Sequence, residues 1–158
     1  MRPVSVLKTK GLLSWPELRY GLYNKWIQGS DIIEFAIAWL EKYPAEVNKK
    51  IVFMAGCNPS DEGELKELLE SYIAEANVSD ENVTDKWRLA FLIVLKMEPD
   101  ENIRLRQLQE IYADFAYPPD MKKCSIYVTD DEIQKGYVSS PLSEMEHVIQ
   151  RLEKRLNP

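Results

Sequence analysis

A run of seven consecutive apolar residues lies in the second half of this 158-residue chain: Leu89-Ala90-Phe91-Leu92-Ile93-Val94-Leu95. Together with the spacing of Trp87, Phe91 and Val94, the run indicates a helix. A helix that is apolar on every side has to be covered over most of its surface. We therefore expect this helix at the centre of the fold.

Helical patterns continue on both sides of the run. Ser14 and Glu17 have capping-box spacing with Pro16 in the first turn, and Gly29 is expected to stop that helix. Pro44 is expected to end the next helix, and Pro118-Pro119 a later one. The patterns predict helices within residues 14–29, 31–44, 60–76, 87–95, 100–117 and 140–156.

Two further segments are ambiguous. Ile51-Val52-Phe53-Met54 has the composition of a short buried strand, but residues 45–56 also fit helical spacing, with Gly56 as a helix end; we favour the helix. Residues 121–136 are the least regular, and they predict either one short strand pair or an extended segment. The expected fold is all-α: a compact bundle of about seven helices in a single domain, residues 1–158, because no Gly/Ser linker divides the chain.

Composition narrows the classes of partner. Lys and Arg number 20 against 26 Asp and Glu, giving a net charge of −6. Nucleic-acid binding needs clustered basic side chains, so we expect neither a nucleic-acid nor a membrane partner. A secretory signal and an apolar stretch of membrane-spanning length are both missing, which predicts a cytoplasmic protein. Cys57 and Cys124 form no Cys-x-x-Cys motif; free thiols are the simpler interpretation, although one disulfide remains open.

The sequence offers little catalytic chemistry. His147 is the single histidine, so a two-histidine zinc site is excluded. A serine triad would have to use His147, and the chain contains no Gly-x-Ser-x-Gly. Glu144 and His147 have the Glu-x-x-His spacing of di-iron bundles, but those sites need two such motifs. The chain contains no Walker A loop and no Gly-x-Gly-x-x-Gly. We therefore predict no catalytic residue, no metal, no cofactor and no enzymatic activity.

Charge is distributed unevenly along the chain. Residues 1–30 carry five bases and one acid, whereas residues 60–85 carry nine acids and one base, a net charge of −8. An acidic surface of this kind would steer a basic partner, although a solvated helix face is the simpler alternative. Tyr20 lies off the expected core face of its helix and is a candidate interface aromatic. The candidate partner-binding residues are Glu67, Glu70, Asp80, Glu81, Asp85 and Tyr20.

Two longer stretches carry a family resemblance. They are Leu13-Ser14-Trp15-Pro16-Glu17-Leu18-Arg19-Tyr20-Gly21-Leu22 and Ile111-Tyr112-Ala113-Asp114-Phe115-Ala116-Tyr117-Pro118-Pro119-Asp120-Met121. They resemble a family of small bacterial proteins found among the immunity proteins of polymorphic and contact-dependent toxin systems. The resemblance implies an antitoxin-like protein that binds and neutralises a cognate toxin. The acidic segment 60–85 adds the hypothesis that this toxin is a basic nuclease domain, whose phosphate-binding cleft an acidic surface would mask. The resemblance implies no catalytic residue.

Two other functions stay open. A helical adaptor that binds another protein, or a second copy of itself, would have the same composition, and the oligomeric state is not set by the sequence. An enzyme that uses carboxylates with a divalent metal is the third candidate. Stabilisation by added metal would favour the enzyme, because a ligand that binds only the folded state raises apparent stability.

Overall fold

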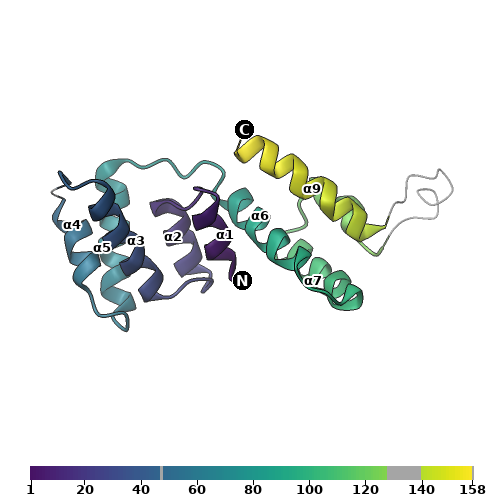
Figure 1. The fold of residues 1–158 in the computed structure, drawn as a ribbon, viewed down its shortest axis with the longest axis horizontal. Helices are drawn as coiled ribbons and strands as arrows, with labels where there is room; N and C mark the ends of the chain where they lie inside the picture. Colours follow the sequence, from purple (N-terminus) through teal and green to yellow (C-terminus); the bar gives the residue numbers. More distant parts are fainter. Residues whose placement is uncertain (47, 128–139, 158) are drawn as a thin grey trace. The chain divides into compact units, whose positions relative to one another are not determined.

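The computed structural model describes residues 1–46, 48–127 and 140–157. In these residues the chain forms eight α-helices and one 3₁₀ helix, and no strand (Figure 1). The all-α prediction is confirmed. The elements are α1 (Pro3–Thr9), α2 (Trp15–Tyr23), α3 (Gly29–Lys42), α4 (Lys49–Gly56), α5 (Glu62–Ala76), α6 (Val83–Lys96), α7 (Glu101–Asp114), the 3₁₀ helix η1 (Pro119–Cys124) and α9 (Pro141–Leu156).

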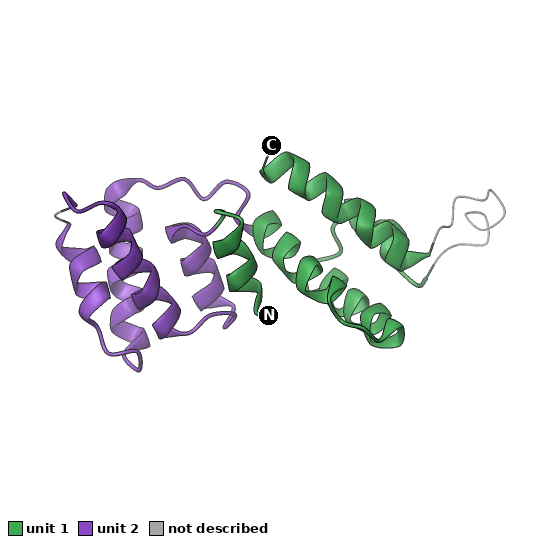
Figure 2. Ribbon diagram, in the orientation of Figure 1, with its two compact units in different colours: residues 1–12, 84–158 green, residues 13–83 purple. Residues whose placement is uncertain are grey.

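The helices group into two compact units (Figure 2). Unit 1 comprises Met1–Leu12 and Thr84–Pro158, and unit 2 comprises Leu13–Val83. Unit 1 is thus built from both ends of the chain. Lys10 after α1 forms an ion pair with Glu153 of α9 (Nζ to Oε1, 3.1 Å), and the side chain of Asn157 donates to the Lys10 carbonyl oxygen at 3.4 Å.

Unit 2 is organised around Trp15. This side chain is 1% exposed, and its ring lies 4.7 Å from Phe35, 5.3 Å from Trp39 and 5.1 Å from Tyr72, measured between centroids. These rings come from α2, α3 and α5. Aliphatic and Met side chains complete the core: Leu18, Ile32, Ile51, Met54, Leu65, Leu69 and Ile73. Residues 49–56 are helical, so the preference for helix over strand in that segment is confirmed.

Unit 1 contains the apolar run from which the fold was deduced. Trp87, Leu89, Ala90, Leu92 and Leu95 of α6 are buried, whereas Phe91, Ile93 and Val94 are half-buried. The helix is therefore covered on most but not all of its surface. The other buried residues of the unit's core are Val4, Val6, Leu7, Leu12, Leu108, Ile111, Met121, Cys124, Met145, Val148, Ile149 and Leu152.

An ion pair between buried Arg88 and exposed Asp120 links α6 to η1. Arg88 is 4% exposed; its Nη1 lies 2.6 Å from Asp120 Oδ1 and its Nη2 lies 3.1 Å from Asp85 Oδ1. Burial by itself lowers the pKa of the Arg88 guanidinium, but the hydrogen bonds and charges of Asp120 and Asp85 outweigh it and raise the pKa above its ordinary value. Arg88 therefore stays charged and holds the two carboxylates in place.

Several local expectations are corrected. Helix α1 was not predicted, and Gly29 begins α3 instead of stopping the preceding helix, which ends at Tyr23. The ideal Cβ position of Gly29 lies 2.3 Å from the carbonyl oxygen of Pro59, so glycine is needed there for close backbone approach. Ser14 does occupy the N-cap of α2, but its side chain makes no capping hydrogen bond.

The segment 121–136 is described only as far as Tyr127. Met121 and Cys124 belong to η1, and residues 125–127 form no strand. The side chain of Gln109 in α7 donates to the Cys124 carbonyl oxygen (2.8 Å) and accepts from the Ile126 amide (3.2 Å). One glutamine thus satisfies the backbone groups that a strand partner would otherwise bind. The remainder of the predicted strand or extended segment, residues 128–136, lies outside the described residues.

Candidate functional site

The negative charge of the chain belongs to unit 2. Residues 13–83 contain 13 acidic and six basic side chains, a net charge of −7, and the rest of the chain is therefore at +1. The acids of unit 2 concentrate on α5 and in the loop after it. Helix α5 packs inward through Leu65, Leu69, Tyr72 and Ile73. Its 3.6-residue period therefore turns Glu67 directly toward solvent.

Two groups of these acids are engaged by bases within unit 2. Arg19 of α2 lies 3.9 Å from a carboxylate oxygen of Glu70 and 3.8 Å from one of Asp80. Glu75 pairs with Lys50 of α4. Such exposed pairs contribute at most about 1 kcal/mol each, so they fix side-chain positions more than stability. The remaining exposed acids of α5 and of the loop after it carry the rest of the charge.

The structure records no ion pair for the other exposed acids of this segment within the described residues. We call these residues the acidic strip: Asp61, Glu62, Glu64, Glu67 and Glu81. Lys66 is the single basic residue between residues 60 and 83. Of the candidate residues deduced from the sequence, Glu67 and Glu81 belong to the strip. Glu70 and Asp80 lie in the same unit, but Arg19 partly neutralises them.

Asp85 has a different role. It belongs to unit 1, where its carboxylate accepts hydrogen bonds from Arg88 and Arg155 and so connects α6 to α9. Two guanidinium groups already neutralise this single acid. Asp85 thus forms ion pairs within unit 1 and is not part of the acidic strip, and its role in partner binding stays a prediction.

A hollow of about 380 Å³ lies in unit 2 between α2 and α5. Arg19, Leu22 and Tyr23 of α2, with Lys25, line one side; Glu62, Gly63, Lys66, Leu69 and Glu70 of α5 line the other. The hollow therefore opens beside the acidic strip. Its lining combines apolar carbon with charges of both signs, a composition typical of the rim of a protein interface.

The exposed aromatic at this hollow is Tyr23, not Tyr20. Tyr23 is 79% exposed, whereas Tyr20 is half-buried with its ring 5.6 Å from that of Trp26. Helical spacing favoured Tyr20, which lies on the side of α2 opposite Leu18 and Leu22, and it gave no signal for Tyr23. That side of α2 is covered: Glu17 and Gly21 are both buried. Tyr23 follows the last covered turn, at the C-terminal end of the helix.

Neither cysteine thiol has the lowered pKa that a catalytic nucleophile needs. Burial raises the pKa of the Cys124 thiol to about 12, with further contributions from Glu144 and Asp120. Burial also raises the pKa of Cys57, followed by the charges of Glu64 and Asp61. Both cysteines are free thiols. A thiol whose pKa is raised holds its proton at neutral pH and is a poor nucleophile.

We expect a clear difference between the two thiols toward a disulfide reagent at pH 8. Half-buried Cys57 should react slowly and buried Cys124 only after unfolding, because the reactive thiolate is a minor species at a pH below each raised pKa. Counting titrated thiols with and without denaturant measures this. Rapid reaction of two thiols in the folded protein would contradict the assignment, and Cys57→Ser identifies which thiol reacts.

His147 is an exposed side chain on α9, with its Nδ1 3.8 Å from Glu144 Oε2. His147 thus lies on the helix surface, whereas the side chain of Glu144 is only 12% exposed. Among the described residues, no group of three or more His, Cys, Asp or Glu side chains is arranged to hold a metal ion. In the same part of the chain, no helix combines the length and apolar character needed to cross a bilayer.

The chain belongs to a family described as uncharacterized proteins conserved in bacteria (DUF2247), whose model matches residues 5–158. Searches of curated proteins and of solved structures each found no match. The resemblance to a bacterial family of unassigned function is thereby confirmed. The association with toxin immunity stays a prediction.

Proposed function

We propose that this member of the bacterial family is an immunity-type protein that binds a basic partner protein, a cognate toxin domain, through the acidic strip and the adjoining hollow of unit 2. One observation carries the proposal. Among the residues that the structure describes, the five exposed carboxylates of the acidic strip form no ion pair, and they lie beside a hollow with an exposed aromatic side chain. Aromatic anchors next to complementary charge are the features that dominate protein interfaces.

The mechanism that follows is masking. An acidic surface attracts a basic protein over a distance of about a Debye length, roughly 8–10 Å at ordinary ionic strength, and so speeds association. After docking, the carboxylates occupy the basic groups that a nuclease would need for phosphate contacts. Tyr23 supplies apolar area at the hollow, where Leu22 and Leu69 also line the surface. Neutralisation by masking requires no catalytic residue on this chain.

The first experiment identifies the partner. The purified chain serves as bait for the C-terminal domain of a large secreted protein encoded beside it, and both are then co-expressed to score growth. Tight binding together with rescue of growth supports immunity. Absence of binding and of rescue overturns this proposal and favours the adaptor alternative.

The second experiment tests the surface. We expect Glu67→Lys/Glu81→Lys to weaken binding of that toxin domain about tenfold at low salt, because two exposed carboxylates become repulsive. The loss should shrink at high salt as screening shortens the range of charge interactions. Glu70 and Asp80 are left unchanged so that the contacts of Arg19 persist. Calorimetry or surface plasmon resonance measures the affinity.

A matched control distinguishes the effect of charge at the acidic strip from the effect of the net charge of the chain. Glu34→Lys/Glu41→Lys changes the net charge by the same amount, but at two exposed acids of α3. It should bind within about twofold of the wild type. Equal losses in the two double variants would show that total charge alone matters. That result would remove the acidic strip as the binding surface.

A further inference from the structure

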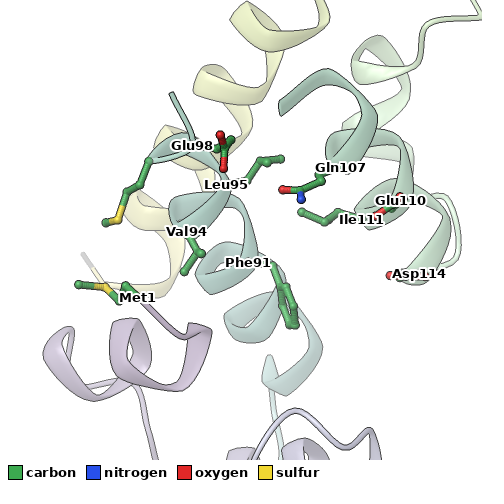
Figure 3. A pocket seen from close by; sticks show the side chains of 10 residues that line it. Met1, Phe91, Val94, Leu95, Glu98, Gln107, Glu110, Ile111 and Asp114 are labelled. Atoms are coloured by element: carbon green, nitrogen blue, oxygen red, sulfur yellow. The ribbon is translucent and has the colours of Figure 1, made fainter. Parts of the chain in front are cut away.

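A second concave surface lies in unit 1, and the function proposed above does not use it. We call it the α6–α7 groove; its volume is about 440 Å³ (Figure 3). Its lining residues are Met1, Phe91, Val94, Leu95, Met97, Glu98, Gln107, Glu110, Ile111 and Asp114. All of them belong to unit 1. The volume lies within the roughly 300–1,000 Å³ typical of ligand sites.

The apolar part of the groove comes mainly from α6. Phe91 and Leu95 extend from α6 on the side of Ile111 of α7, whereas Val94 extends on the side of Met1 (Figure 3). Phe91 and Val94 are two of the three half-buried residues of the apolar run; Ile93, the third, does not line the groove. Met1 and Met97 are 71% and 54% exposed. Flexible, polarizable methionines adapt to varied partners and are common at peptide-binding surfaces.

The charged side chains that line the groove are all acidic. Glu98, Glu110 and Asp114 line it, and none of the ten lining residues is basic. Arg104 is held at the junction of the two helices, where its guanidinium donates to the carbonyl oxygens of Glu98 (2.7 Å) and Pro99 (3.2 Å). An occupant must therefore bring apolar side chains for the centre and positive charge for the edge. An anionic membrane or a nucleic acid would be repelled.

We propose that the α6–α7 groove docks an amphipathic, basic segment of a protein, with its apolar side chains against Phe91 and Val94 and its Lys or Arg side chains at Glu110 and Asp114. This is the mode in which an amphipathic helix binds an apolar groove. The inference does not rest on the function proposed for unit 2. It assigns unit 1 a docking surface of its own.

The test uses the full chain with ¹³C-methyl methionine and a synthetic peptide. The peptide places Leu at helical i, i+3 and i+4 positions with Lys beside them. The five methionines provide internal controls: Met1 and Met97 line the groove, whereas Met54, Met121 and Met145 are at most 2% exposed. Added peptide should shift the Met97 and Met1 signals and leave the buried three unchanged. No shift at millimolar peptide overturns the proposal.

Two comparisons establish specificity. A peptide with every Lys replaced by Glu should bind at least about tenfold more weakly, as should the Lys peptide on Glu110→Lys/Asp114→Lys. Glu101→Lys is the control variant: this exposed acid begins α7, does not line the groove, and lies half a helical turn from the direction of Glu110. It should bind within about twofold of wild type. Equal binding by wild type and Glu110→Lys/Asp114→Lys overturns the proposal.

The double variant of the acidic strip in unit 2 tests whether the two proposals are independent. Glu67→Lys/Glu81→Lys should leave the Met97 shift unchanged, because neither residue lines the groove. Loss of the shift in that variant would mean that the peptide binds to general negative charge, which also overturns the proposal. Because Glu110 and Asp114 are exposed, their reversal should leave the thermal melt of the chain within a few degrees of wild type.

Discussion

Replacing Trp15 by alanine is expected to destabilise the chain by about 3–5 kcal/mol, the range measured for large aromatic residues in cores. Trp15 is 1% exposed and its ring contacts those of Phe35, Trp39 and Tyr72. Truncation would leave a cavity between α2, α3 and α5 that three large rings cannot close without leaving their rotamers. Denaturant titration followed by far-UV circular dichroism measures the loss.

Two variants define the origin of that loss. Tyr23→Ala removes a comparable aromatic from the same helix, but Tyr23 is 79% exposed, so stability should change by less than about 0.5 kcal/mol. Trp15→Phe keeps a ring and removes an indole N–H that has no hydrogen-bond partner among the described residues. A buried donor without a partner costs about 1–3 kcal/mol, so Trp15→Phe should lose much less than Trp15→Ala. Equal losses in Trp15→Ala and Tyr23→Ala would contradict the assigned core.

Gly29→Ala is expected to destabilise unit 2 by about 1–3 kcal/mol although it adds one methyl group. The added Cβ would lie 2.3 Å from the Pro59 carbonyl oxygen and 3.0 Å from Leu65 Cδ1. The first of these is a backbone atom, so relief requires the segment before α5 to move away from the start of α3. The same titration measures the change.

Gly63 supplies the matched control. It lies in the first turn of α5 with no atom within 4 Å of its ideal Cβ position. Gly63→Ala should therefore stabilise the chain by about 0.5–1 kcal/mol through helix propensity. Opposite signs for the two substitutions would establish close backbone approach at Gly29. A stabilising Gly29→Ala would contradict the packing of Pro59 against α3.

The helix ends that the sequence predicted correctly depend on interactions between residues close in the chain. Asp100 caps α7 by accepting from the amides of Asn102 (2.9 Å) and Ile103 (3.1 Å), and such bonds span only three residues. Asn77 ends α5 in the left-handed conformation at φ 50°, which asparagine tolerates. The expectation for Gly29 failed because a glycine stop and a glycine at close backbone approach look identical in one sequence. Pro59, thirty residues away, distinguishes them.

In the candidate site, too, some properties follow from the sequence and others only from the tertiary structure. The acidic character of residues 60–85 follows from composition, and the outward direction of Glu67 follows from the period of a helix. The ion-pair partners of those acids, in contrast, follow neither from composition nor from helical period. Arg19 engages Glu70 and Asp80 because α2 packs beside α5, and Asp85 is taken up by Arg88 and by Arg155, seventy residues later. Tyr23 replaces Tyr20 as the exposed aromatic for a related reason, since the burial of Glu17 and Gly21 has no signature in helical spacing.

The sequence by itself determined that this chain is all-helical, where most of its helices lie and that its charge is concentrated between residues 60 and 85. Each of these properties depends on side chains within about one helical turn of each other, or on composition alone. Only the tertiary structure decided that the chain divides into two units with net charges of −7 and +1, which acids remain without ion pairs, and that α6 and α7 leave a groove between them. Those properties depend on contacts between residues far apart in the chain, which the order of residues does not display.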